Sequence, residues 1–357
     1  MQLWCVDNLF PRGKVCLIRI CARAHSRFGV YDNPLNQLRV VIIGSGGMAT
    51  ARAKRVSEHE DMTLAVIASR NVETSTELAA RHGVECTQDW MGTVRRPDVD
   101  AVVLTTHPDT RAEIGMAVLS AGKHLFTESP LALSPRDGSR LLAMAHYNGL
   151  VIRVGHTSAL RPETRLIQEQ TAVLGGPVHD HVMIQPSEDA RRGRRPGFDQ
   201  RISGHPVVYA VLLGLPVIYA RGPIVEVAAG TWIEPDGDVF DRCAVHVTLM
   251  FEDRGLATIS YRRGFAGQAK AGRNVLCRNG SIMYTDGAGH ITVTASGESR
   301  DVPVPEADSW REELDEFVAA IRTGESMSVS VMEAARIVSL IDAVCAAASA
   351  GPAFRPI

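Results

Sequence analysis

The sequence predicts an α/β fold in which a doubly wound N-terminal domain precedes a C-terminal α/β domain with a large, mostly antiparallel sheet. From about residue 38 to residue 156, apolar strands alternate with helices, which is typical of parallel strands joined by right-handed crossovers. After residue 156, strands follow one another with few helices between them, which indicates antiparallel pairing. The length, 357 residues, is enough for two such domains.

The N-terminal domain is justified by its elements in chain order. Residues 1–37 have no clear period and are expected to form an extension outside the domain. Strands and helices are recognised by apolar runs and by helical spacing of apolar residues. Strands are expected at 38–44 (LRVVIIG), 62–69, 98–106, 123–128 and 151–156, and helices at 50–59, 72–83, 110–122 and 134–149.

The C-terminal domain is expected over residues 157–357. Short strands joined by turns such as 252–255 and 286–287 indicate a sheet. The strands are expected at 181–185, 224–233, 243–251, 256–262, 274–278, 281–285 and 290–294. Two amphipathic helices within 309–350 close the chain and are expected to pack back on the domains.

Charge and cysteine content exclude several classes of protein. Lys and Arg total 38 and Asp and Glu total 40, so the formal net charge is −2, which argues against a nucleic-acid partner. The seven cysteines include no C-x-x-C pair, as expected of a reduced, cytoplasmic protein. Cys5, Cys16, Cys21 and His25 match no zinc spacing, so no metal is expected.

The sequence argues against a secretory signal and against a membrane-spanning helix. Asp7 and Arg19 flank and interrupt the only apolar stretch near the N-terminus. The uncharged run 202–220 contains two prolines and two glycines, so a buried helix is expected there rather than a transmembrane helix.

A glycine motif at the first strand-to-helix turn predicts a dinucleotide site. Gly44, Gly46 and Ala49 form G-x-G-x-x-A directly after the first strand. In such a turn the first glycine allows the tight bend, the second lets the backbone approach a pyrophosphate, and the small third residue packs helix on strand. The helix N-terminus then faces the phosphates. The alternative is a structural glycine turn in another doubly wound fold.

The end of the second strand favours NADP, with NAD as the alternative. It reads Ala68-Ser69-Arg70, where an NAD site usually places Asp or Glu for the ribose 2′-hydroxyl. Ser69 and Arg70 instead offer donors for a 2′-phosphate. The other interpretation of Arg70 is a solvated residue at the start of the next helix.

These residues resemble the glucose-fructose oxidoreductase / inositol dehydrogenase / rhizopine catabolism (Gfo/Idh/MocA) family. The resemblance covers residue 38 to about residue 351 and rests on VVIIGSGGMA, DVDAVVLTT, AEIGMAVLSAGKHLFTESPLAL and REELDEFVAAIRTG. It implies a Rossmann domain followed by a domain whose open sheet commonly forms homo-oligomers, here a dimer or tetramer. It also implies oxidation or reduction of a sugar, cyclitol or polyol hydroxyl with NAD(P).

The resemblance implies that several usual site residues are replaced. The family's Glu-Lys-Pro reads Glu128-Ser129-Pro130, so serine stands in place of the lysine. Tyr209 stands at the usual Asp position and Leu213 at the usual His position, although a one-residue gap nearby leaves the register open. The arginine often found shortly before Pro162 is replaced by Ala159, and Arg161 follows two residues later.

The candidates for acid–base chemistry are Tyr209, His205, His156 and Ser129. Removal of a hydride from an alcohol carbon needs a group that accepts the hydroxyl proton. Tyr209 shares a helix face with residue 213, although an apolar packing role is its alternative. His205 is alternatively a capping residue. Glu128 is expected to orient its loop rather than to transfer protons.

The remaining site candidates bind cofactor or substrate. The cofactor-binding set is Gly44, Gly46, Gly47, Met48, Ala49, Ser69, Arg70, Thr106, His107, Pro108, Glu128 and Ser129. The substrate-binding set is Arg161, Arg191, Arg192 and Tyr209. The dense cluster at 191–195 suits a phosphate-bearing sugar, with a solvated loop or an oligomer contact as alternatives. His179 and His181 alternate on one strand face, where a sheet-surface or interface role is expected.

The predicted function is NAD(P)-dependent hydride transfer between the nicotinamide and a hydroxyl or keto carbon of a sugar or sugar nucleotide. The alternative is a catalytically inactive cofactor- or sugar-binding protein of the same fold, because the usual proton-transfer positions are replaced. The expected partners are a small sugar-like substrate and further copies of the chain, with no nucleic acid and no membrane.

Overall fold

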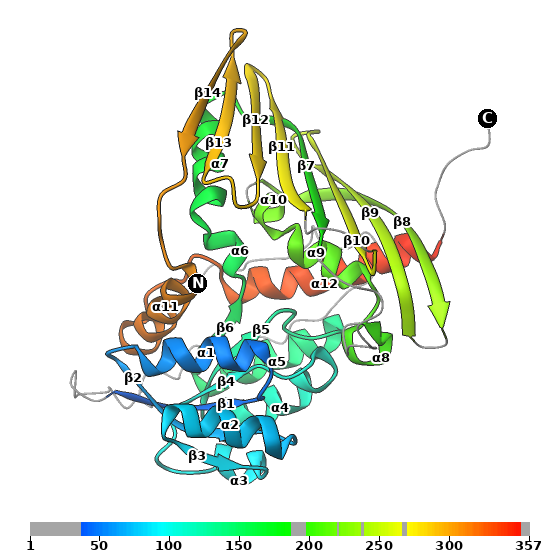
Figure 1. The fold of residues 1–357 in the computed structure, drawn as a ribbon. Helices are drawn as coiled ribbons and strands as arrows, with labels where there is room; N and C mark the ends of the chain where they lie inside the picture. Colours follow the sequence, from blue (N-terminus) through cyan, green and yellow to red (C-terminus); the bar gives the residue numbers. More distant parts are fainter. Residues whose placement is uncertain (1–36, 187–197, 220, 237–238, 266–269, 351–357) are drawn as a thin grey trace, which may run out of the picture. The chain divides into compact units, whose positions relative to one another are not determined.

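Two β-sheets organise the computed structural model, which describes residues 37–186, 198–219, 221–236, 239–265 and 270–350 (Figure 1). The first sheet is entirely parallel, in the order β3-β2-β1-β4-β5-β6. Its strands are β1 (Leu38–Ile43), β2 (Met62–Ala68), β3 (Glu85–Thr87), β4 (Ala101–Leu104), β5 (His124–Glu128) and β6 (Ile152–Gly155). The strand order reverses between β1 and β4, which confirms the doubly wound Rossmann fold.

Local signals in the sequence begin and end the helices of this half. The side chain of Asn71 accepts from the backbone N–H of Thr74 at the start of α2, and Gly83 ends that helix in the left-handed conformation. Ser134 and Gly149 bound α5 in the same way. The helices are α1 (Gly47–Ser57), α2 (Val72–His82), α3 (Trp90–Val94), α4 (Pro108–Ser120) and α5 (Pro135–Asn148).

The second sheet has eight strands in the order β14-β13-β12-β11-β7-β10-β9-β8. Only the β7–β10 pair is parallel among the pairs of this sheet in the described residues, so the predicted mostly antiparallel sheet is confirmed. Its strands are β7 (Pro177–Gln185), β8 (Ile224–Asp236), β9 (Val239–Phe251), β10 (Leu256–Arg263), β11 (Lys270–Cys277), β12 (Gly280–Thr285), β13 (His290–Ala295) and β14 (Glu298–Pro303).

Helices cover one face of the second sheet. Helix α12 contacts β8 and α9, and α7 contacts β12 and β13 (Figure 1). Helix α11 instead packs on α1 of the first half, and the ring of Phe317 meets that of Phe126 edge-on at 5.7 Å. The helices are α6 (Thr157–Leu160), α7 (Pro162–Val173), α8 (Gln200–Ser203), α9 (Val207–Leu213), α10 (Leu215–Tyr219), α11 (Ser309–Thr323) and α12 (Val331–Ser349).

The prediction of one buried helix over 202–220 was wrong. Three short helices, α8, α9 and α10, occupy this run. Gly204 adopts φ +77° and ends α8, while Pro206 caps α9 and Gly214 separates α9 from α10. Glycine and proline therefore divide an apolar run that hydropathy alone joins. Within the described ranges, no helix has the length and apolar character needed to cross a bilayer.

The sequence analysis predicted neither the strands β3 and β14 nor the helices α3, α6 and α7, although α7 is 12 residues long. Strand β3 and helix α3 are only three and five residues long. Strand β14 reads ESRDVP and is mostly exposed at the edge of the second sheet. Of the predicted N-terminal extension, residues 1–36 lie outside the described residues.

Candidate functional site

The turn after β1 forms a cradle of backbone at the carboxyl edge of the first sheet. Gly44 has φ +126°, and a Cβ built on it would lie 2.3 Å from Oγ1 of Thr105. A Cβ on Gly46 or Gly47 would meet nothing within 4 Å. Gly46 caps α1 without a side-chain hydrogen bond, so backbone N–H groups of the first turn are available to an anion. The residues present therefore fit a dinucleotide pyrophosphate.

Three hydroxyl groups meet where β2 ends. Oγ of Ser45 lies 2.8 Å from Oγ of Ser69 and 2.7 Å from Oγ1 of Thr74. Arg70 is exposed and follows directly. Glu73 lies in the first turn of α2 and is also exposed. No carboxylate occupies the last position of β2, where Ala68 stands, or the two residues after it.

The turns after β4 and β5 lie beside this cradle on the same edge. His107 caps α4 and is exposed, while Pro108 is buried at the first position of that helix. Arg111 joins the two turns, since its Nε donates to the carbonyl of Thr106 at 3.0 Å and its Nη1 to the carbonyl of Pro130 at 3.2 Å. The predicted cofactor residues on β1, β4 and β5 thus lie at one edge.

Glu128 and Ser129 are engaged with other parts of the protein. Oε1 of Glu128 accepts from Nε of Arg52 at 2.7 Å, and only 6% of Glu128 is exposed. Oγ of Ser129 donates to the carbonyl of Gly155 at 2.7 Å. The hydroxyl of Ser129, an acid–base candidate, is therefore already engaged with the backbone of β6.

Tyr209 lies in a group of stacked side chains that we call the α9 wall, formed by Tyr209, Tyr261, Arg263 and Phe198. The rings of Tyr209 and Tyr261 stack at 6.3 Å. The guanidinium of Arg263 lies 5.0 Å from the ring centre of Tyr209 and 4.4 Å from that of Phe198. Leu133, between β5 and α5, packs against the same apolar cluster as Tyr209, and a Cβ on Gly204 before α9 would lie 3.0 Å from Cδ2 of Leu133.

The two histidine candidates differ in exposure. His205 is half-buried, and its Nδ1 accepts from the backbone N–H of Val207 at 3.3 Å, as a capping residue would. Burial lowers its pKa. His156 is only 2% exposed, and its Nδ1 lies 2.8 Å from the hydroxyl of Tyr219. Burial, aided by the charge of Arg153, lowers the pKa of His156 to about 3. His156, one of the acid–base candidates, is therefore a core histidine.

The predicted substrate arginines are only partly described. Arg161 precedes α7 and lies on an open pocket of about 830 Å³ with Tyr284 and Asp286. This pocket is lined by α7, the β12–β13 turn and the start of α11, and none of the predicted cofactor residues contributes to it. Arg191 and Arg192 lie outside the described residues.

Metal ligands are not grouped anywhere in the described ranges, where no cluster of three His, Cys, Asp or Glu side chains has the geometry to hold an ion. His179 and His181 stack on β7 at 6.4 Å. Their Nε2 atoms lie 3.0 Å from Oγ1 of Thr258 and 3.2 Å from Oγ of Ser260, on the next strand.

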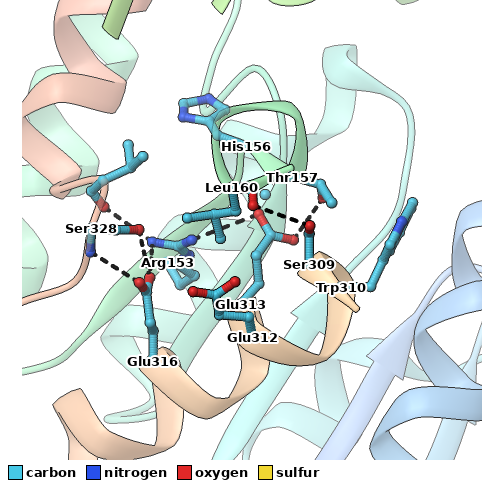
Figure 2. Close-up of polar contacts among 12 residues, drawn as sticks. Arg153, His156, Thr157, Leu160, Ser309, Trp310, Glu312, Glu313, Glu316 and Ser328 are labelled. Carbon is cyan, nitrogen blue, oxygen red and sulfur yellow. Dashed lines mark hydrogen bonds and ion pairs between the residues drawn. The ribbon is translucent and has the colours of Figure 1, made fainter. Parts of the chain in front are cut away.

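Sequence reasoning missed a buried charge cluster under the site, formed by Arg52, Glu128, Glu313, Arg153 and Glu316. Glu313 accepts from Nη2 of Arg52 and from Oγ1 of Thr157, both at 2.8 Å. Figure 2 shows Glu313 with Thr157 on one side and Arg153 on the other. A signal was available, because Arg52 falls on the apolar stripe of α1 with Ala49, Ala53 and Val56.

Comparisons with known proteins agree with this geometry. The model of the oxidoreductase family with an NAD-binding Rossmann fold, Gfo/Idh/MocA, matches residues 38–156. The 4-carboxy-2-hydroxymuconate-6-semialdehyde dehydrogenase of a Sphingobium species is 27% identical over 306 residues, which cover 82% of this chain and 93% of the relative. The myo-inositol 2-dehydrogenase of Thermotoga maritima is 25% identical over 310 residues, which cover 82% of this chain and 91% of the relative.

A solved structure shares the fold over nearly its whole length. The biliverdin reductase of Synechocystis in complex with biliverdin and NADP+ superposes with a TM-score of 0.81 and 20% identity, covering 87% of this chain and 99% of that one. The parallel sheet, its glycine turn and the matched family define an NAD(P)-dependent oxidoreductase. The match of residues 38–156 to the Gfo/Idh/MocA model agrees with the resemblance seen in the sequence.

Proposed function

We propose that the protein transfers a hydride reversibly between the nicotinamide of NADP and a hydroxyl or keto carbon of a sugar or sugar nucleotide. In this proposal residues 38–156 bind the dinucleotide and residues 157–357 supply the substrate and oligomer surfaces. The supporting observation is that Arg111 joins the turns after β4 and β5, and that Leu133, between β5 and α5, packs against the same apolar cluster as Tyr209. These contacts support a place for the α9 wall near the edge at which the glycine turn lies.

The preference for NADP rests on the end of β2. Ser69, Arg70 and the N-terminus of α2 would hold the 2′-phosphate, and the hydroxyls of Ser45 and Thr74 lie beside Ser69. A guanidinium and hydroxyl donors suit a phosphate, and a carboxylate at this position would repel it. The bound nicotinamide supplies the hydride chemistry, whereas the protein supplies orientation and proton transfer.

Tyr209 is the proposed proton donor and acceptor. A phenol can give a proton to a carbonyl oxygen or take one from a hydroxyl. Tyr209 is half-buried on α9, whereas His156 is buried and the hydroxyl of Ser129 donates to a backbone carbonyl. His205, two residues before α9, is the second candidate.

A sugar-like substrate is supported by the curated relatives. They include a myo-inositol 2-dehydrogenase and several dTDP-3,4-didehydro-2,6-dideoxy-alpha-D-glucose 3-reductases. Arg161, Arg191 and Arg192 are the proposed contacts for an anionic part of the substrate, such as a nucleotide phosphate.

The test is a cofactor and substrate screen on the purified protein. Affinities for NADPH and NADH are measured by calorimetry, and polyols, ketosugars and nucleotide sugars are then screened at 340 nm in both directions. We expect the protein to bind NADPH more tightly than NADH and to turn over at least one of the screened compounds. Binding of dinucleotide without turnover of any hydroxyl or keto substrate would contradict the proposed reaction.

We also propose that the open face of the second sheet joins copies of the chain. Five large apolar side chains lie on this face and are 36% to 55% exposed. They are Met183, Trp232, Leu256, Leu276 and Met283. An exposed apolar sheet face of this kind is typical of an interface. Sedimentation of the wild-type protein should show a dimer or tetramer, and Met283→Arg should reduce the size of this oligomer. A monomeric wild-type protein would contradict the proposed interface.

A further inference from the structure

Arg52 lies in the second turn of α1, directly after the glycine turn, and is completely buried. It donates from Nε to Oε1 of Glu128 at 2.7 Å and from Nη2 to Oε2 of Glu313 at 2.8 Å. We infer that Arg52 is a positioning residue, which holds the Glu128–Ser129 turn in register with α1 and so aligns the two halves of the bound dinucleotide. This inference rests on the proposed placement of the dinucleotide along the carboxyl edge.

The guanidinium of Arg52 is fixed by two aromatic rings. Its central carbon lies 4.4 Å from the ring centre of Phe126 on β5 and 4.5 Å from that of Trp310 on α11. Burial opposes its charge, but Glu128 and Glu313 outweigh burial and raise the pKa of Arg52. A charged group with both a flat stacking site and two carboxylate partners has little freedom to move.

The backbone of β6 leaves room for this contact. A Cβ on Gly155 would lie 2.9 Å from Nη2 of Arg52 and 2.9 Å from Oε2 of Glu128. The carbonyl of Gly155 also accepts from Oγ of Ser129. Arg52, Glu128, Ser129 and the end of β6 therefore form one continuous set of contacts. A shift of Arg52 would change the position of the turn that carries Ser129.

The second carboxylate partner is itself anchored. Oε2 of Glu313 accepts from Oγ1 of Thr157 at 2.8 Å, and Oε1 lies 3.7 Å from Nη2 of Arg153 (Figure 2). Glu313 is completely buried, so removal of one partner would leave a costly unpaired charge. Helix α11 thus provides a fixed point against which Arg52 sets α1 and β5.

The two ends of the dinucleotide depend on Arg52 differently. The adenine half would contact α1 and the end of β2, which stay together through the direct β1–β2 pairing without Arg52. The nicotinamide half would contact the turns after β4 and β5, and the β5 turn is held to α1 by Arg52. Loss of Arg52 is therefore expected to weaken binding of the whole dinucleotide and to spare binding of its adenine half.

The test compares Arg52→Met with Arg55→Met by calorimetry on the full chain. Arg55 lies one turn further along α1 and reaches the same helix α11, through Asp308 at 3.3 Å, but its side chain is 25% exposed and it does not touch Glu128. Each variant is titrated with NADPH and with 2′,5′-ADP, or with NADH and ADP if the wild-type protein binds NADH more tightly. No substrate is used, so an error in the proposed substrate or cofactor preference leaves the result readable.

For Arg52→Met we expect binding of the whole dinucleotide to weaken about tenfold, with the adenine half bound as by the wild-type protein. The dinucleotide affinity of Arg52→Lys should lie between those of the wild-type protein and Arg52→Met. An ammonium keeps the charge, but it lacks the forked guanidinium that contacts two carboxylates. Arg55→Met should bind both probes normally. Unchanged dinucleotide affinity in Arg52→Met would overturn the inference, and so would an equal loss for both probes.

Glu128→Gln provides the same test if Arg52→Met does not fold. It keeps the size of the side chain and removes the charge that Arg52 contacts. The same selective loss, of smaller size, is expected for the whole dinucleotide. Wild-type affinity for both probes in folded Glu128→Gln would overturn the inference.

Discussion

The glycine turn at the carboxyl edge of the first sheet consists of backbone, whereas the α9 wall consists of side chains. At the edge, Gly44, Gly46 and Gly47 remove side chains so that backbone N–H groups face the ligand. At the wall, Tyr209 and Arg263 present long side chains stacked on their neighbours. A backbone cradle depends on local conformation, whereas a side-chain wall depends on residues far apart in sequence. We therefore propose that the edge binds the cofactor and that the α9 wall contributes to substrate recognition.

The largest effect is expected from a substitution that distorts the glycine turn and leaves the α9 wall unchanged. Gly44→Ala places a methyl group 2.3 Å from Oγ1 of Thr105 at a φ of +126°, which an L-residue rarely adopts. We expect dinucleotide affinity to fall about a hundredfold or more and the free energy of unfolding to fall by about 2 kcal/mol. Calorimetry and urea unfolding measure the two effects.

Gly47→Ala is the matched control for stability. Its φ lies outside the left-handed region, and its Cβ would meet nothing within 4 Å. The midpoint of unfolding should be unchanged or slightly higher, because alanine is the better helix former. Equal stability of the two variants would show that Gly44 is not constrained as described.

Histidines that burial keeps neutral lie at both ends of the first sheet, and they predict a pH dependence of stability. Burial lowers the pKa of His124, the first residue of β5, to about 4, and that of His156, directly after β6, to about 3. Below the unfolded pKa of about 6.5, the unfolded chain binds protons that the folded chain does not. Stability should therefore fall as the pH decreases from 6.5 towards 4, by about 1.4 kcal/mol per pH unit for each histidine.

Urea unfolding at several pH values between 6.5 and 4.5 measures this slope. His124→Gln removes one of these buried groups, so its slope should be shallower than that of the wild-type protein by about 1.4 kcal/mol per pH unit. The exposed His107 provides the control, and His107→Gln should keep the wild-type slope. Parallel slopes for His124→Gln and the wild-type protein would contradict the assignment.

A smaller effect sharpens the description of the edge. Arg70→Ala should weaken NADPH binding about tenfold and leave NADH binding unchanged, because only the 2′-phosphate needs the guanidinium. Arg81→Ala, at the far end of α2, is the control and should change neither affinity. An equal loss for NADPH and NADH would place Arg70 away from the 2′-phosphate.

The parts of the fold that were predictable carry local signals. The run LRVVIIG and the glycines after it predicted β1 and its turn, because burial on both faces requires an apolar strand and a tight bend requires glycine. The exposed, charged strand β14 carries no such signal, since its pairing with β13 defines it as a strand. The glycines and prolines of 202–220 indicated that the run is divided into short helices. We gave more weight to its continuous apolar character and predicted one helix.

The glycine turn was predictable because its backbone conformation is encoded locally. Contacts between side chains that are far apart in the sequence were not predictable. Gly44 and Ala49 follow a motif with a known purpose. Arg52 looks in sequence like any helix arginine, and its partner Glu313 is 261 residues away. His156 was misplaced for the same reason, because the Tyr219 that engages it belongs to a helix 63 residues later. Only the folded structure brings these residues together.

The proposed function divides two roles between two regions: the edge would bind the dinucleotide, and Tyr209 of the α9 wall would donate or accept the proton. Tyr209→Phe tests this division most directly, because it removes one hydroxyl and keeps the stack on Tyr261. With the best substrate from the screen, we predict that turnover falls about a hundredfold or more while the calorimetric Kd for NADPH stays the same. Full turnover by Tyr209→Phe would contradict the proposed role of Tyr209 in proton transfer.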